Sequence, residues 1–219
     1  MSSPESMPRN PHPAAVTLSA SRTAAGEGRS KVLALPGSLR RDSYNRRLLE
    51  AAVDLAPTGM AIAIYPDLVS IPLFNEDLER ADGGPEAVRR LRTEVAAADA
   101  LLIATPEYNQ SIPGVLKNAI DWLSRPDPIE VLEGKVVSVI GASSGPWGTR
   151  LAQSALRQVL HATGAYVLPG PALFLRDAER MFDAEGSLVD RPTRERLAAV
   201  LAGLAGWIQR VAAGSRADG

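Results

Sequence analysis

The chain has 219 residues and a formal net charge of −1; 45% of its residues are hydrophobic and 22% are charged. This composition is typical of a globular domain with one core, and a charge so close to zero predicts neither nucleic acid nor an anionic membrane surface as a partner. The absence of cysteine excludes disulfides, thiolate nucleophiles, iron–sulfur clusters and cysteine-ligated zinc. We also find no uninterrupted apolar stretch of about 18 residues, so we expect no membrane-spanning segment.

The N-terminal segment is rich in serine, proline, alanine and glycine, and it lacks the apolar core of a secretory signal. We therefore predict a disordered N-terminal extension over residues 1–29, with a transit-type segment as the alternative. A folded domain is predicted over residues 30–213, and residues 214–219 are expected to fray. We expect the protein to be cytoplasmic.

From residue 31 onward, short apolar strands alternate with amphipathic helices. The strands are predicted at 31–36, 60–66, 98–105 and 135–142, with a fifth inside 165–175. The helices are predicted at 43–56, after Pro85, and at 113–123, 149–162 and 192–211, where apolar residues recur at helical spacing.

This alternation predicts an α/β fold in which a parallel sheet is covered by helices on both faces. Right-handed crossovers leave few arrangements of five strands. The best supported is a flavodoxin-like three-layer sandwich with a five-stranded parallel sheet in the order 2-1-3-4-5. In such sheets a ligand binds beyond the carboxyl ends of the strands, where the strand order reverses. We therefore expect a site in the loops after strands 1, 3 and 4.

The loop after the first strand, residues 36–45, reads PGSLRRDSYN. It enters a helix whose first N–H groups have no intrahelical partner, and Arg40 and Arg41 add positive charge. Backbone donors, hydroxyls and a helix N-terminus together favour a phosphate seat. The alternative is that Asp42 or Ser43 only caps the helix while the arginines are solvated.

The loop after the third strand, residues 105–114, reads TPEYNQSIPG. Pro106 and Pro113 stiffen its two ends. Between them we expect backbone N–H and C=O groups to be free for a ligand, while Tyr108 and Asn109 offer a ring and an amide. Such a loop suits a flat heterocycle with nitrogen and oxygen edges, such as a flavin. The alternative is a structural loop with Tyr108 packed on its own chain.

The loop after the fourth strand, residues 141–148, reads GASSGPWG. Its glycines are expected to let the backbone approach a ring, and Ser143 and Ser144 offer hydroxyls and N–H groups. Donors at a helix start would stabilise the negative charge that develops on a reduced flavin. Trp147 is expected either to form a pocket wall or to pack under the sheet edge.

Other charged residues fit surface roles better than chemistry. Asp121 falls on the body of a helix, so a pair of hydrolytic carboxylates with Glu107 is disfavoured. Glu107 and Lys117 are more consistent with subunit contacts. The segment RRLRTE at 89–94 is expected to be a solvated helix face.

Four segments together resemble the NADPH-dependent FMN reductases, a family that includes bacterial chromate and quinone reductases and related azoreductases. They are GSLRRDSYNRRLL, PLFNEDLE, TPEYNQSIPGVLKNAIDWLSRP and GKVVSVIGASSG. The resemblance covers about residues 31–211 and implies a flavodoxin-like fold, tightly bound FMN, NADPH or NADH as co-substrate, and a homodimer or homotetramer. The N-terminal extension and the segment GPWG depart from the family pattern.

By position, the resemblance implies phosphate contacts in the first loop, isoalloxazine contacts in the second, and a serine contact after the fourth strand. The candidate FMN-binding residues are Ser38, Leu39, Arg40, Ser43, Tyr44, Asn45, Pro106, Glu107, Tyr108, Asn109, Ser111, Gly114, Ser143, Ser144 and Gly145.

The activity implied is that of an FMN-dependent NAD(P)H oxidoreductase. Two electrons would pass from the nicotinamide through FMN to a small acceptor, which is a quinone, a flavin, an azo compound or chromate. Because the cofactor carries the electrons, we expect no catalytic side chain and no metal. One alternative is a non-enzymatic, flavodoxin-like electron carrier, which should be acidic; the other is a phosphate-ligand binding or hydrolytic protein without flavin.

Overall fold

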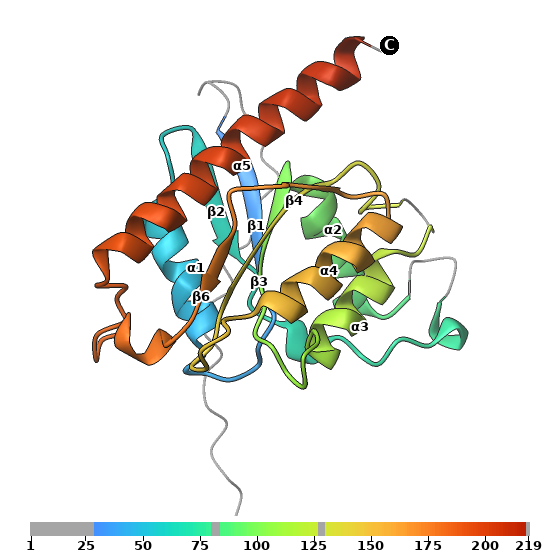
Figure 1. Cartoon of the computed structure of the whole chain (residues 1–219). Helices are drawn as coiled ribbons and strands as arrows, with labels where there is room; N and C mark the ends of the chain where they lie inside the picture. Colours follow the sequence, from blue (N-terminus) through green and yellow to red (C-terminus); the bar gives the residue numbers. More distant parts are fainter. Residues whose placement is uncertain (1–28, 80–83, 127–129, 218–219) are drawn as a thin grey trace, which may run out of the picture.

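A computed structural model describes residues 29–79, 84–126 and 130–217 (Figure 1). The N-terminal extension expected over residues 1–29 lies outside the described residues except for its last residue, and so do residues 218 and 219. The strands are β1 (Ser30–Pro36), β2 (Met60–Ile64), β3 (Ala100–Ala104), β4 (Val136–Ala142), β5 (Tyr166–Val167) and β6 (Leu173–Leu175). The helices are α1 (Tyr44–Asp54), α2 (Glu86–Ala97), α3 (Gly114–Leu123), α4 (Arg150–Ala162) and α5 (Arg191–Ala217).

The sheet has the strand order β2-β1-β3-β4-β5, and every pair in it is parallel. This confirms the predicted order. In the register, Leu33 of β1 lies opposite Leu101 of β3, which in turn lies opposite Val137 of β4. These three side chains are fully buried, as expected for central strands that are covered on both faces.

The fifth strand differs from the prediction, because it is divided in two. Both β5 and β6 pair with β4 in parallel. Pro169 and Pro171 lie between them, and proline has no N–H to donate to the ladder. Leu175 of β6 pairs with Ala142 of β4, so the segment after β6 lies at the same rim of the sheet as the loop after β4.

Two hydrophobic cores confirm the three-layer arrangement. Helices α1 and α5 cover one face, and α2, α3 and α4 cover the other (Figure 1). The alternation along β1 separates the two cores, since Val32 and Ala34 belong to the first while Leu33 and Leu35 belong to the second. The two faces therefore use the same strands, and the carboxyl ends of those strands stay available for loops.

Helix α5 stands out by its composition and by its length. Among the described residues it is the one helix long and apolar enough, by length and composition, to cross a membrane. Leu197, Val200, Leu201 and Leu204 on this helix are fully buried against the first face of the sheet, but only 22% of its most apolar 18-residue stretch is buried. The helix also continues to Ala217, beyond the predicted end and into the segment that was expected to fray.

The segment 89–94 is not a wholly solvated face, because Arg92 is only 5% exposed. Its guanidinium donates to the carbonyl oxygens of Trp122 and Arg125, each at 2.9 Å. Arg92 on α2 thereby caps the C-terminal end of α3, where carbonyl groups lack intrahelical donors.

We expect Arg92→Met to lower the free energy of unfolding by about 2 kcal/mol. Methionine can replace the apolar stem of the arginine, but the two carbonyl groups lose their donor. Urea unfolding followed by circular dichroism measures the change. The matched control is Arg46→Met, which removes only a partly exposed i,i+4 ion pair with Glu50 and should cost at most about 0.5 kcal/mol. Equal losses in the two variants would contradict the capping role.

Candidate functional site

The loops after β1, β3 and β4 meet at one rim of the sheet and enclose a cavity of about 110 Å³. Most of the candidate residues line it, together with Ala142, which was not predicted. Leu39, Asn109, Ser111, Gly114 and Gly145 do not line it. The lining residues are Ser38, Arg40, Ser43, Tyr44, Asn45, Pro106, Glu107, Tyr108, Ala142, Ser143 and Ser144.

In the first loop, Ser43 is the N-cap of α1, and its Oγ accepts a hydrogen bond from the N–H of Asn45 at 3.2 Å. The capping interpretation is therefore confirmed for Ser43. The Oγ of Ser38 accepts from the N–H of Arg40 at 3.3 Å and lies 3.5 Å from the hydroxyl of Tyr108. The exposed Arg40 side chain leaves a positive charge at the mouth of the cavity.

Asn45 joins the first loop to the third. Its Nδ2 donates to the carbonyl oxygen of Ala142, and its Oδ1 accepts from the N–H of Ala142, both at 2.9 Å. The residue is only 2% exposed. Because both ends of the amide bond to Ala142, the side chain holds the first and third loops together.

The second loop contains a tight hairpin turn. Tyr108 and Ser111 exchange two backbone hydrogen bonds of 3.1 and 3.0 Å, and Asn109 and Gln110 between them have φ values of 50° and 63°. Positive φ at both central residues defines a type I′ turn. The expectation that the backbone groups of this loop are free is therefore wrong for Tyr108 and Ser111. The turn instead presents the ring of Tyr108, which is 47% exposed, at the cavity.

Glu107 has a role that was not expected. Its Oε2 accepts from the N–H groups of Leu151 and Ala152, at 2.8 and 3.0 Å. These two N–H groups lie in the first turn of α4 and have no acceptor within the helix. The helix dipole favours a negative charge at this position. Within the described chain, Glu107 therefore caps a helix from another loop, a role that the sequence did not indicate.

We expect Glu107→Gln to lower the free energy of unfolding by about 1 kcal/mol, because the amide keeps one acceptor but loses the charge that complements the helix N-terminus. Guanidinium unfolding monitored by tryptophan fluorescence tests this. Glu195→Gln is the control, since Glu195 pairs only with the exposed Arg191 on α5. An unfolding midpoint identical to that of the unmodified protein would rule out the cap.

Sequence reasoning missed the close contact behind the cavity. A Cβ atom added to Gly141 would lie 2.0 Å from Oγ1 of Thr149 and 2.4 Å from the carbonyl oxygen of Thr105. Both threonines are fully buried. Gly141 therefore sets how closely the second and third loops approach each other. The available signal was a glycine within a strand that is mostly apolar and rich in β-branched residues, since such a glycine often marks a close backbone approach.

In the third loop, the Oγ of Ser143 accepts from the N–H of Gly145 at 2.9 Å, and the N–H of Ser143 donates to the carbonyl oxygen of Leu175 at 2.9 Å. The loop is thus tied to β6. Trp147 is 75% exposed, so it does not pack under the sheet edge, and it does not line the rim cavity.

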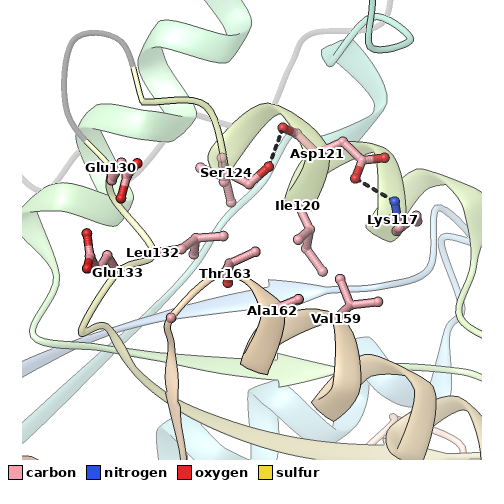
Figure 2. Close-up of a pocket in the computed structure, with 12 residues that line it drawn as sticks. Lys117, Ile120, Asp121, Ser124, Glu130, Leu132, Glu133, Val159, Ala162 and Thr163 are labelled. Atoms are coloured by element: carbon pink, nitrogen blue, oxygen red, sulfur yellow. Dashed lines mark hydrogen bonds and ion pairs between the residues drawn. The ribbon is translucent and has the colours of Figure 1, made fainter.

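A larger hollow of about 630 Å³ lies between α3 and α4, away from the candidate residues (Figure 2). Its rim carries Glu130 and Glu133, and Asp121 forms an ion pair with Lys117. A hydrogen bond to Glu133 raises the pKa of Glu130, and the negative charge of Glu133 adds to this effect. The surplus negative charge at this hollow does not suit a phosphate.

The rim cavity fits one end of FMN better than the whole molecule. Pockets that enclose a complete small ligand occupy about 300–1,000 Å³, whereas this cavity encloses about 110 Å³. Hydroxyls, an arginine and the start of α1 suit the phosphate end, and the ring would lie along the open rim beside Tyr108. Fold and site together define a flavodoxin-like nucleotide-binding protein.

Comparison with known proteins specifies this class further. The family model for NADPH-dependent FMN reductases matches residues 30–180. An NAD(P)H-dependent FMN reductase of Pseudomonas aeruginosa is 48% identical over 83% of this chain and 96% of its own length. A 2-hydroxy-1,4-benzoquinone reductase of a Burkholderia species is 40% identical over 82% of this chain and 96% of its own length. The chain belongs to the NADPH-dependent FMN reductase family.

A solved structure supports the same assignment. The flavoenzyme FerB of Paracoccus denitrificans, an NAD(P)H:(acceptor) oxidoreductase, superposes with a TM-score of 0.76 at 35% identity. The match covers 83% of this chain and 98% of FerB. The fold is therefore shared with a flavoenzyme over nearly the full length of that enzyme.

Proposed function

We propose that this protein is an FMN-dependent NAD(P)H oxidoreductase whose small-molecule acceptors include quinones. The observation that carries the proposal is the convergence of the three rim loops on one cavity in a chain of the FMN reductase family. Relatives named as quinone reductases are 37–40% identical over most of the chain, which supports quinones as the first acceptors to test. Free flavin, azo compounds and chromate are the other candidates.

Each loop has a separate task in binding FMN. The phosphate-binding site is surrounded by Ser38, Arg40 and Ser43. Hydroxyls and backbone N–H groups donate hydrogen bonds to the phosphate dianion there, and the arginine adds one positive charge. The turn that carries Tyr108 flanks the ring on one side, and Ser143 and Ser144 flank it on the other. The remaining candidates, including Leu39, Tyr44, Pro106, Asn109, Ser111, Gly114 and Gly145, shape the loops around these contacts.

Bound FMN supplies two-electron hydride chemistry at its N5 atom, so the protein needs no nucleophile of its own. The described residues contain no group of three or more histidine, aspartate or glutamate side chains arranged to hold a metal. The chain's part is to hold the cofactor rigidly and to leave one side of it open. The buried pair Asn45–Ala142 and the cap formed by Glu107 provide that rigidity.

The electron-carrier alternative has less support, because such a carrier should be acidic, whereas the net charge of this chain is only −1. The family match also favours an enzyme.

We further propose that the protein is a homodimer or homotetramer, as the resemblance to the FMN reductases implies, and that it is located in the cytoplasm.

The decisive experiment measures NADPH and NADH oxidation by the purified, FMN-loaded protein with a benzoquinone as acceptor. We expect turnover with a parallel-line, ping-pong pattern that is lost when FMN is removed and regained when it is restored. A yellow protein without turnover on any acceptor would favour the electron carrier. A colourless protein that does not take up FMN would favour a flavin-free phosphate-binding protein.

A further inference from the structure

A second hollow lies at the same rim as the FMN cavity and has no place in the function proposed so far. Its volume is about 570 Å³, and its walls are Pro146, Trp147, Arg150, Phe174 and Arg176. The indole of Trp147 is 75% exposed and Phe174 is 38% exposed. Two exposed aromatic side chains and two arginines thus share one surface depression.

The arginines give this hollow an unbalanced positive charge. Among the residues that the structure describes, no carboxylate lies within ion-pair distance of Arg150 or Arg176. Glu107 already occupies the N–H groups at Leu151 and Ala152 in the first turn of α4. An anion in the hollow would therefore be held by the two guanidinium groups and not by the end of the helix.

Backbone contacts hold the two sides of the hollow together. Ser143 donates to the carbonyl oxygen of Leu175, and Ala178 donates to the carbonyl oxygen of Ser143 at 3.1 Å. Gly148 has a φ of 64°, and a Cβ atom there would lie 3.2 Å from the carbonyl carbon of Phe174. Gly148, one of the loop glycines expected to approach a flavin ring, therefore brings the backbone of the loop close to β6, so that Trp147 and Phe174 line the same hollow.

The hollow is separate from the FMN cavity but lies close to it along the chain. Ser144 lines the cavity and Pro146 lines the hollow, and two residues span at most about 8 Å between Cα atoms. A ligand that reaches the flavin with one end can place its other end here. That end should carry an aromatic base for Trp147 and Phe174 and a phosphate for the arginines.

The geometry points to a binding site for the 2′-phosphorylated adenosine end of NADPH, in which Arg150 and Arg176 select NADPH over NADH. This inference rests on the proposed function, because it concerns the co-substrate of the same reaction. Arg150 and Arg176 bind the 2′-phosphate, which NADH lacks, and Trp147 stacks on the adenine, which both nucleotides carry. Loss of an arginine should therefore affect NADPH alone, whereas loss of Trp147 should affect both nucleotides.

The test compares kcat/KM for NADPH and NADH in the FMN-loaded protein and in three variants. We expect Arg150→Gln and Arg176→Gln each to lower the NADPH-to-NADH ratio of kcat/KM by about tenfold, as for the loss of one charge-assisted phosphate contact. Trp147→Ala should raise KM for both nucleotides by about fivefold or more, through lost base stacking. The matched control is Arg210→Gln, because Arg210 also lies over a tryptophan, Trp207, but on the far part of α5; its ratio should equal that of the unmodified protein.

Binding without turnover gives an independent readout. In calorimetry with FMN-loaded protein, adenosine 2′,5′-bisphosphate should bind at least about tenfold more tightly than adenosine 5′-monophosphate, and Arg150→Gln or Arg176→Gln should abolish the difference. If the protein oxidises neither nucleotide, the proposed function fails. The calorimetric comparison still decides whether the hollow binds a 2′-phosphorylated adenosine.

Three results would overturn the inference. An unchanged NADPH-to-NADH ratio in both arginine variants would show that the arginines do not read the 2′-phosphate. A change confined to KM for the quinone would assign the hollow to the acceptor. A change of oligomeric state in Trp147→Ala, measured by sedimentation, would assign it to a contact between copies of the chain.

Discussion

We expect Gly141→Ala to lower the free energy of unfolding by about 3 kcal/mol or more. The new methyl group would lie 2.0 Å from Oγ1 of Thr149 and 2.4 Å from the carbonyl oxygen of Thr105, and the latter belongs to the backbone. Either β4 or the start of the second loop must move, and both border the FMN cavity. Urea unfolding of the FMN-free protein measures this cost without a contribution from cofactor binding.

The matched control for Gly141→Ala is Gly114→Ala, which adds the same methyl group at the first residue of α3. Apart from its chain neighbours and its own helix backbone, no atom of the described residues lies within 4 Å of a Cβ atom at Gly114, so we expect the stability of this variant to be unchanged or raised by about 0.5 kcal/mol. If the two variants unfold at the same urea concentration, the tight contact at Gly141 does not set the position of the loops. Because Gly114 is also a proposed FMN neighbour, weaker retention of FMN by the stable Gly114→Ala variant would support that assignment.

The second large effect is expected for Asn45→Leu. Leucine matches asparagine closely in size, but the buried N–H and C=O groups of Ala142 lose both partners. Each unpaired group costs about 1–3 kcal/mol, so we expect a loss of about 3 kcal/mol in the free energy of unfolding. Since the first and third loops are then no longer joined, the dissociation constant of FMN should rise on the order of tenfold, which corresponds to about 1.4 kcal/mol of binding free energy. Fluorescence titration of the FMN-free protein with FMN measures that constant.

Asn118→Leu separates the local effect from a general loss of stability. Asn118 on α3 has the same bonding pattern, since its Oδ1 accepts from the N–H of Phe74 and its Nδ2 donates to the carbonyl oxygen of Pro72. It does not line the FMN cavity. We expect a similar loss of stability with little change in FMN affinity. If both variants weaken FMN binding equally, Asn45 contributes only through overall stability.

The secondary structure and its order followed from the sequence because periodic burial leaves a periodic pattern. Strands covered on both faces read as short apolar runs, and helices with one buried face repeat every three or four residues. The sheet order then followed from the alternation and from right-handed crossovers. The break between β5 and β6 had a readable signal too, since Pro169 and Pro171 interrupt the apolar run, but two strands of two and three residues are too short to give a pattern.

The positions of the rim loops were likewise predictable, while the roles of their polar residues were not. Asn45 finds its partner 97 residues away, and Glu107 finds its partners 44 and 45 residues away. A hydrogen bond across such a separation leaves no spacing in the sequence. The turn at Asn109 and Gln110 had only a weak signal, because asparagine tolerates positive φ but glutamine is not a usual turn residue there.

The sequence by itself determined the fold class, the strand order and the three loops in which a phosphate and a flat ring could be bound. Only the tertiary structure decided that Arg92 caps α3 instead of facing solvent, that Glu107 caps α4, and that Trp147 stands beside Arg176 in a separate hollow. The physical reason is that backbone periodicity is a local property of the chain, whereas the partner of a polar side chain is whichever group the finished packing brings within about 3 Å.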